Sequence, residues 1–200
     1  MASQRFQQVI ARIDQLNRED PTQAIEDGVS HPRELLYSQR LTTWVLRLNP
    51  GASEALRIAA HGQHVCRWTI PRSRYEMNRK GYLRWREALK AFHADTVAEL
   101  MGGAGYPAEL IQRVRVIMGK RELPHDSETQ TLEDALCLVF LETQFADLKR
   151  KTPEEKMREI VRKTWQKMSA QGRAAALKLP LGEEDRSFLR QAIAGASGEK

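Results

Sequence analysis

The spacing of apolar residues constrains this chain more than any other feature. Nearly every apolar stretch repeats with the period of an α-helix, and the breaks between stretches carry helix-end signals. The first stripe comprises Phe6, Val9, Ile10, Ile13 and Leu16. The alternating pattern of a half-buried strand has few places to form. The sequence therefore predicts an all-α fold.

Prolines at first helical positions and glycines after last turns predict where the helices begin and end. Asp20 before Pro21 predicts a short helix that ends near Gly28. Thr131 and Asp134 have the spacing of a capping box that opens an apolar helix. Further helices are expected from Pro32 to Leu48, from Ala52 or Ser53 through the histidines that follow, from Tyr82 to Met101, from Pro107, from Pro153, and over 183–194.

Length and composition favour one domain. A chain of 200 residues with 41% hydrophobic content can bury one sizeable core. We expect a single compact helical domain over residues 1–194 and a flexible tail over 195–200. No apolar run suits a secretion signal or a membrane span, so we expect a cytoplasmic protein without a membrane partner. Cys66 and Cys137 are expected to be reduced core thiols.

Positive charge is concentrated in one stretch. The chain carries a formal charge of +6, and residues 67–90 contain eight basic residues against two acids. Arginine binds phosphate through a planar fork, and aromatic faces stack on bases. A phosphate or base could therefore be bound by residues of both kinds, namely Arg67, Arg72, Arg79, Trp68 and Tyr82. The alternative is a solvated face whose aromatic residues belong to the core.

Three histidines are candidate ligands. His61 and His64 are three residues apart, and on one helix they would share a face, as a metal-ligand pair does. Gly62 between them is unfavourable inside a helix and indicates a close approach, for which a tight helix crossing is the simpler explanation. His93 could point inward as a ligand or as an ordinary core residue. Asp134 opens an apolar helix, where an acid can also serve only as a cap.

The order of these features resembles the HD-domain superfamily, helical metal-dependent phosphohydrolases with a histidine, a His-Asp pair and a distant aspartate. The segments that carry the resemblance are 54–67, 93–95 and 132–135. The resemblance implies an HD-domain-like orthogonal helix bundle with a core of about 30–147, followed by C-terminal helices over 153–194. It also implies one divalent ion, Mn²⁺, Mg²⁺ or Zn²⁺, held by His64, His93 and Asp134.

Two positions depart from the HD pattern. If Arg40 matches the arginine that usually follows the first histidine, Tyr37 stands where that histidine should be. The pair becomes Gln63-His64, and Gln63 is carried over as a catalytic position together with His64 and Asp134. Three protein ligands with open positions still suffice for a catalytic metal. A metal-free pocket that binds its ligand through arginines remains the alternative.

A closer resemblance is to an uncharacterised family, number 4202 among the domains of unknown function. It is carried by the segments 62–72, 81–86 and 132–142 and extends over nearly the whole chain. It implies a fold and a site but no activity.

The sequence thus leads to three functional hypotheses. The first is a metal-dependent phosphohydrolase acting on a nucleotide or another anionic, phosphorylated small molecule, with the arginines holding phosphate. The second is a noncatalytic module that binds a nucleotide or RNA through the basic loop within residues 67–90. The third is a protein-interaction domain in which the histidines are structural.

Overall fold

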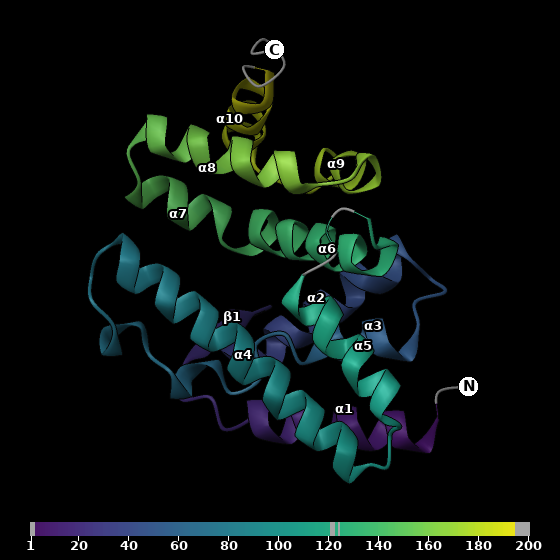
Figure 1. The fold of residues 1–200 in the computed structure, drawn as a ribbon. Coiled ribbons are helices and arrows are strands. Elements are labelled where there is room, and N and C mark those ends of the chain that lie inside the picture. The colour runs from purple at the N-terminus through teal and green to yellow at the C-terminus, as the bar shows by residue number, and fades with distance from the viewer. Residues whose placement is uncertain (1–2, 121–122, 124, 195–200) are drawn as a thin grey trace. The chain divides into compact units, whose positions relative to one another are not determined.

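The computed structural model describes residues 3–120, 123 and 125–194, and there the fold is all-α apart from one short hairpin (Figure 1). The predicted fold class is confirmed. Contacts divide the chain into two compact units, residues 1–129 and 130–200. This division does not test the expectation of a single domain over 1–194 with an HD-like core, and both stay predictions. The tail expected over 195–200 lies outside the described residues.

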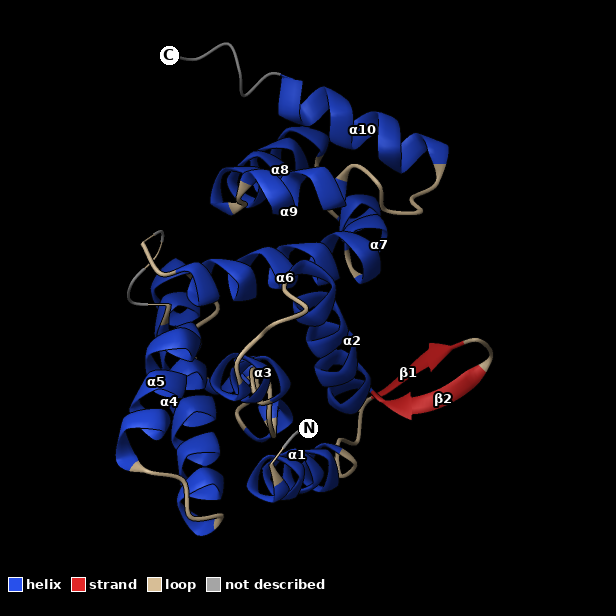
Figure 2. Cartoon of the chain, turned by 90° about the vertical axis from the view of Figure 1, so that its right-hand side faces the viewer, coloured by secondary structure: helices blue, strands red, loops and turns tan. Residues whose placement is uncertain are grey.

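The first unit is built around a short central helix. Helix α3 (Glu54–His61) packs against α1 (Gln4–Asn17), α2 (Arg33–Leu48) and α5 (Ala108–Gly119). Helix α4 (Arg79–Gly103) packs along α5, and Figure 2 shows α3 enclosed by these elements. Most of α3 is buried, including Leu56, Ile58 and Ala59, which explains its strongly apolar sequence. The unit also contains two 3-10 turns, η1 (Arg67–Thr69) and η2 (Arg72–Arg74).

A β-hairpin replaces the short helix expected before Gly28. Strands β1 (Gln23–Glu26) and β2 (Val29–Pro32) pair antiparallel and extend from the start of α2 (Figure 2). Asp27 and Gly28 connect them with positive φ angles of 49° and 79°, as a two-residue hairpin turn requires. The helix prediction was wrong because this Asp-Gly turn signal prevails over Asp20-Pro21. Asp20 instead supports α2, since its Oδ2 accepts a hydrogen bond from the Glu34 amide at 3.0 Å.

Helix α3 ends earlier than the sequence indicated. It stops at His61, and the chain then turns, so His61 and His64 do not share a helical face as expected. A Cβ on Gly62 would lie 2.3 Å from Cγ2 of Val97 on α4. The close approach predicted at Gly62 is therefore a tight helix crossing.

The second unit contains α7 (Phe145–Lys151), α8 (Glu154–Lys167), α9 (Ala170–Ala176) and α10 (Glu183–Ala194), with α8 packed on α7 and α10. Helix α6 (Ser127–Thr143) begins at the end of the first unit and continues into the second. Its start is held by Asp126, whose Oδ1 accepts from the amides of Glu128 and Thr129. The capping box expected at Thr131 and Asp134 was wrong, because both residues lie inside the helix.

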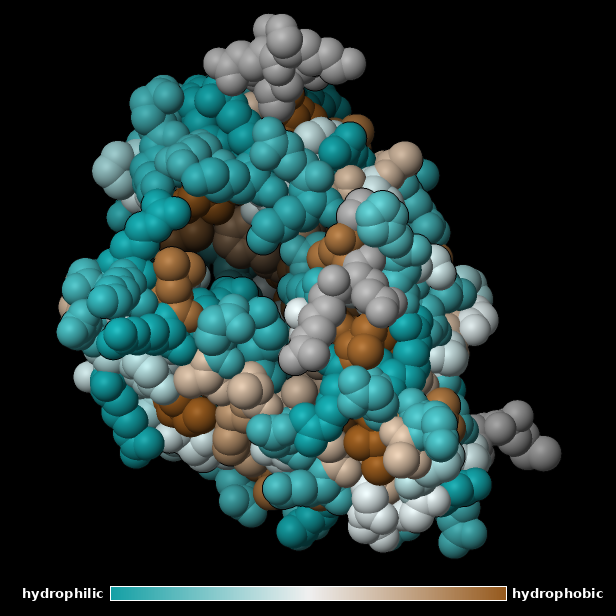
Figure 3. All heavy atoms as spheres, in the orientation of Figure 1, coloured by the Kyte–Doolittle hydropathy of each residue, from teal (hydrophilic) through white to brown (hydrophobic). Residues whose placement is uncertain are grey.

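Hydrophilic residues cover most of the face shown in Figure 3. Within the described residues, no helix is both long and apolar enough to cross a membrane. Both cysteines are free thiols; Cys137 is buried as expected, whereas Cys66 is only half-buried.

Candidate functional site

Helices α2 and α4 and the turn after α3 bring four side chains together in the first unit, those of Glu34, Tyr37, His64 and His93. His64 Nδ1 lies 3.1 Å from Oε2 of Glu34, which is in the first turn of α2. The His64 ring stacks on Tyr37 at a centroid distance of 4.0 Å, and its centroid lies 5.9 Å from that of His93 on α4. We call these residues, with Arg67, the His64 site.

The turn that carries His64 is fixed from α1. Cys66 adopts a left-handed backbone conformation, with φ of 52°, and its amide donates to Oδ1 of the fully buried Asn17 at 3.2 Å. A left-handed conformation is uncommon outside glycine, so the surrounding contacts must hold it. Its neighbour Val65 presents its carbonyl oxygen to Nδ1 of His93 at 2.8 Å. The turn therefore positions both histidines of the site.

His93 is a neutral imidazole with an unused acceptor. Because a carbonyl oxygen only accepts, Nδ1 of His93 must carry the proton that it donates to Val65. The Nε2 atom then has a lone pair, and it is buried without a hydrogen-bond partner among the described residues. Burial, and to a smaller extent nearby His64, lower the pKa of His93 from 6.5 to about 3. A buried, unprotonated Nε2 is the form of histidine that binds metal ions.

His64 is held in the same tautomer. A carboxylate also only accepts, so Nδ1 of His64 donates to Glu34 and leaves Nε2 unprotonated. Burial lowers the pKa of His64 below its ordinary value and outweighs the raising effect of Glu34. The charges of Arg67 and Arg86 lower this pKa as well. His64 is therefore neutral at neutral pH.

Glu34 is the charged group at the centre of the site. Burial raises the pKa of its carboxyl, but the hydrogen bond from His64 and the neighbouring positive charges outweigh burial and lower the pKa overall. These charges include Arg33, which lies 3.3 Å from Oε1, and Arg67. The Arg67 guanidinium also lies over the Trp85 ring, 4.9 Å from its centroid, and burial lowers the pKa of Arg67. The site thus combines one buried anion with several cations.

Sequence reasoning did not identify Glu34, although its signal is present. Ser38, Leu41 and Val45 follow Glu34 at helical spacing, and all four are buried on one face of α2. An acid on an otherwise buried face needs a partner, which could have directed attention to it. Arg40, taken as the marker of the HD pattern, instead pairs with Glu26 of the hairpin.

Gln63 lies beside His64 in the turn and is largely buried. Its Oε1 has no hydrogen-bond partner in residues 3–120, 123 and 125–194. Its catalytic role stays a prediction.

Asp134 lies in the second unit, where its carboxylate binds the residue that precedes α9. Its Oδ1 accepts from the Ser169 amide at 2.8 Å and from Nε2 of Gln130 at 3.0 Å, and its Oδ2 accepts from the Ser169 hydroxyl. A Cβ on Gly172 would lie 2.6 Å from the Asp134 carboxyl carbon, so α9 begins directly against it. A metal site shared by Asp134, His64 and His93 stays a prediction.

In the part of the chain that the structure describes, no three His, Cys, Asp or Glu side chains are grouped so that they could hold a metal ion. The His64 site offers two imidazole nitrogens as candidate ligands. Two imidazoles sharing one ion through bonds of about 2.1 Å have centroids roughly 5 to 6 Å apart. The separation of His64 and His93, 5.9 Å, is within that range.

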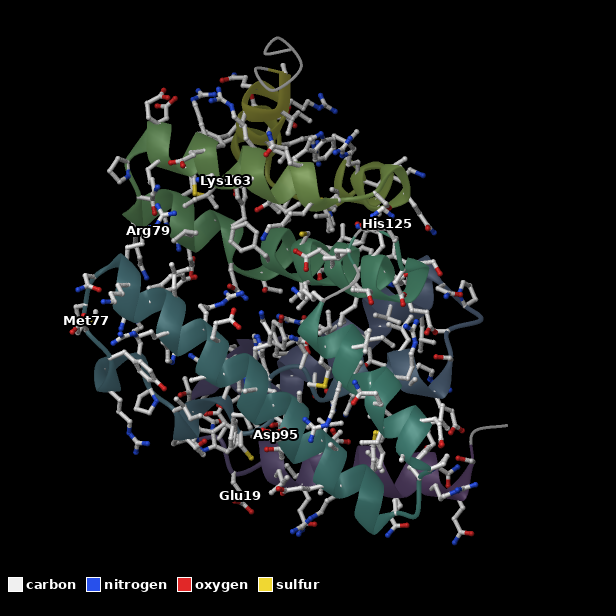
Figure 4. The ribbon with its side chains drawn as sticks, in the orientation of Figure 1. Glu19, Met77, Arg79, Asp95, His125 and Lys163 are labelled. Carbon is white, nitrogen blue, oxygen red and sulfur yellow. The ribbon has the colours of Figure 1, made fainter. Side chains whose placement is uncertain are left out.

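The predicted ligand-binding residues of the basic loop divide into two groups. Arg72 is committed to the loop itself, because its guanidinium donates to the carbonyls of Tyr75, Glu76 and Asn78. Arg79 and Tyr82 are exposed, and Figure 4 places Arg79 at the N-terminal end of α4, far along that helix from Asp95. Their roles, and that of the half-buried Trp68, stay predictions.

A pocket of the first unit lies between α4 and α5, away from the His64 site. It has a volume of about 520 Å³ and is lined by Ala94 and Asp95 of α4 and by Arg115 of α5, among others. None of the site residues predicted from the sequence lines it.

Comparison with known proteins gives one match. The model of a family described as a domain of unknown function, DUF4202, matches residues 7–189. No curated protein and no solved structure matches the chain.

Proposed function

The chain belongs to the DUF4202 family, whose description assigns no activity, so we propose a function from the His64 site alone. It is that of a metal-dependent phosphohydrolase acting on a phosphorylated small molecule. The family predicted from the sequence is confirmed by this membership, whereas the HD-domain link stays a prediction. The observation that carries the proposal is the buried Nε2 of His93, which has no hydrogen-bond partner in the described part of the chain and lies near a second neutral imidazole.

The donor atoms support a divalent ion. Histidines that bind metals donate their other ring N–H to a carboxylate or a backbone carbonyl, which fixes the tautomer. His64 donates to the carboxylate of Glu34, and His93 donates to the carbonyl of Val65. His64 and His93 would therefore hold a transition-metal ion, Zn²⁺ or Mn²⁺, through Nε2, since the Mg²⁺ also expected from the sequence prefers oxygen ligands. A bound divalent ion lowers the pKa of a water molecule and so supplies a hydroxide nucleophile.

The charges around the site suit a phosphorylated substrate. Arg67 and Arg86 are both close enough to His64 to lower its pKa. Arginines bind phosphate oxygens through charge-assisted hydrogen bonds, and they stabilise the charge that develops during phosphoryl transfer. In this proposal Arg67 orients the phosphate, while Glu34 keeps Nδ1 of His64 protonated and thereby directs its Nε2 lone pair.

The test is phosphate release from a panel of nucleoside phosphates and sugar phosphates in the presence of Mn²⁺. His64→Gln and His93→Gln are expected to reduce turnover at least about a hundredfold, because losing a ligand should cost more than the roughly 10- to 100-fold that losing a partner of a ligand costs. His31→Gln, which changes a histidine of the hairpin, serves as the matched control and is expected to keep full activity. Equal activity in all four proteins would reject the His64 site as the catalytic centre.

The noncatalytic alternative, a nucleotide- or RNA-binding module using residues 67–90, has less support. Its candidate clamp Arg72 already donates to three loop carbonyls. Exposed Tyr82 and Arg79 favour it. Ligand binding that chelators leave unchanged and Arg79→Gln abolishes would select it over the hydrolase.

A further inference from the structure

The loop before α4, residues 75–78, exposes the apolar side chain of Met77 to solvent. The Arg72 guanidinium donates to the carbonyl oxygens of Tyr75, Glu76 and Asn78, at 3.0, 2.5 and 3.2 Å. These carbonyls lie on both sides of Met77 in the sequence. The side chain of Met77 is 81% exposed, the highest value among the large hydrophobic residues of the described chain. Arg72 therefore fixes the backbone around an exposed methionine.

The first turn of α4 contacts the same loop and helps to hold it in place. Oδ1 of Asn78 accepts from the Gly81 amide at 2.8 Å and caps the helix. A Cβ on Gly81 would lie only 2.1 Å from the carbonyl oxygen of Glu76, so the loop lies directly on the helix. Figure 4 shows Met77 and Arg79 at the N-terminal end of α4, at an edge of the first unit. A rigid backbone thus presents Met77 outward, where burial within this unit cannot account for an apolar residue.

The positive charges beside Met77 lie where they destabilise helix α4. Arg79 and Lys80 are the first two residues of α4, both are exposed, and the first turn contains no acid. Cations near the positive end of the helix dipole are unfavourable, whereas an anion there is favourable. Leu83, 53% exposed, and the exposed Arg84 follow on the next turn. The arrangement suits an external anionic surface that also accepts apolar side chains.

We propose that Met77, Arg79, Lys80, Leu83 and Arg84, here called the Met77 surface, dock onto an anionic lipid membrane. Peripheral membrane attachment combines apolar side chains that enter the headgroup region with basic residues that bind anionic lipids. Met77 and Leu83 favour lipid over RNA, because their aliphatic side chains can enter a bilayer but cannot stack on a base. The exposed ring of Tyr82 beside them suits either partner, since tyrosine also lies at the headgroup level of membranes. The proposal goes beyond the proposed hydrolase and departs from the sequence expectation of no membrane partner, which was based on the lack of an apolar run long enough to span a membrane.

The test is flotation of the full chain with vesicles of phosphatidylcholine mixed with phosphatidylserine, and with vesicles of phosphatidylcholine alone. Wild type is expected to float only with the mixed vesicles and less at high salt. Met77→Ser is expected to weaken binding about tenfold, because the side chain no longer enters the bilayer. Arg79→Gln with Lys80→Gln is expected to weaken it about thirtyfold, since each cation near an anionic membrane contributes roughly fivefold.

Two controls match these variants. Ile25→Ser removes another exposed apolar residue, on the hairpin, and is expected to bind like wild type. Lys151→Gln with Lys178→Gln removes two exposed charges from the second unit and is expected to have a much smaller effect than the Arg79 and Lys80 pair. Circular dichroism of each variant would establish that it is folded.

Three outcomes would overturn the proposal. The first is a wild type that does not float with the mixed vesicles at low salt. The second is binding that Met77→Ser leaves unchanged, which would reduce the interaction to nonspecific charge attraction. The third is single-stranded RNA binding that is lost in the same variants while vesicle binding is absent, which would assign the surface to RNA.

Discussion

The His64 site and the Met77 surface both gather positive charge in the first unit. This charge lies beside a buried carboxylate in the His64 site and is exposed to solvent in the Met77 surface. At the His64 site, Arg67 and two neutral histidines surround the buried carboxylate of Glu34. At the Met77 surface, Arg79 and Lys80 are exposed at a helix end that does not favour them. Buried charges need partners, and solvated charges do not. The first arrangement suits a small ligand and the second an extended one.

The largest expected effect on stability comes from Glu34, the buried anion of the His64 site. Glu34→Ala removes the acceptor of His64 and leaves Arg67 without its nearby anion, so we expect the free energy of unfolding to fall by about 3 kcal/mol. Glu26→Ala is the matched control, because it breaks the partly exposed pair with Arg40, and its effect should stay below about 1 kcal/mol. Urea unfolding followed by circular dichroism measures both. Equal effects would remove the distinction between buried and exposed charges.

The pH dependence of stability should come from the buried region. The pKa of His93 is about 3 in the folded protein and near 6.5 when unfolded, so between these values the unfolded state binds more protons. Stability therefore falls as the pH is lowered through this window, by up to about 1.4 kcal/mol per pH unit from His93.

His93→Gln should flatten this slope in chelator-treated protein, whereas His31→Gln should leave it unchanged. Urea unfolding across the window gives the slopes. A slope that His93→Gln does not alter would mean that His93 is not buried in its neutral form.

The smallest expected effect on overall stability belongs to Arg72. Arg72→Ala frees three carbonyls that water can satisfy, so the free energy of unfolding should change by less than about 1 kcal/mol. The loop should loosen, and trypsin should cleave after Arg74 and Arg79 faster than in wild type. Lys151→Ala is the control with unchanged loop cleavage. Unchanged cleavage in Arg72→Ala would show that the Arg72 contacts do not hold the loop.

Local signals in the sequence predicted most helices, including α2, α4, α5, α8 and α10, because apolar period and proline or glycine positions act within a few residues. They failed where one local signal competed with another, as at Asp27-Gly28, whose turn formed a hairpin. They also failed for α9, whose start depends on Asp134, 35 residues earlier in the chain.

The site was predictable only in part. His64 and His93 could be proposed as ligand residues from type and order, and the structure brings them together. The tautomers could not be predicted, since they depend on Glu34 and on the Val65 carbonyl, which come from different segments. Likewise, no pattern around Arg72 indicated that its donors would be used by the carbonyls beside Met77.

Divalent-metal content tests the proposed catalytic centre most directly. Wild type, His64→Gln, His93→Gln and His31→Gln would be reconstituted with Mn²⁺ or Zn²⁺, desalted and measured by elemental analysis, with Asp134→Ala as a separate test of the predicted third ligand. We expect about one ion per chain in wild type and His31→Gln, and loss of that ion in His64→Gln and His93→Gln. Folded wild type without metal, or equal metal in all variants, would contradict a metal centre at His64 and His93.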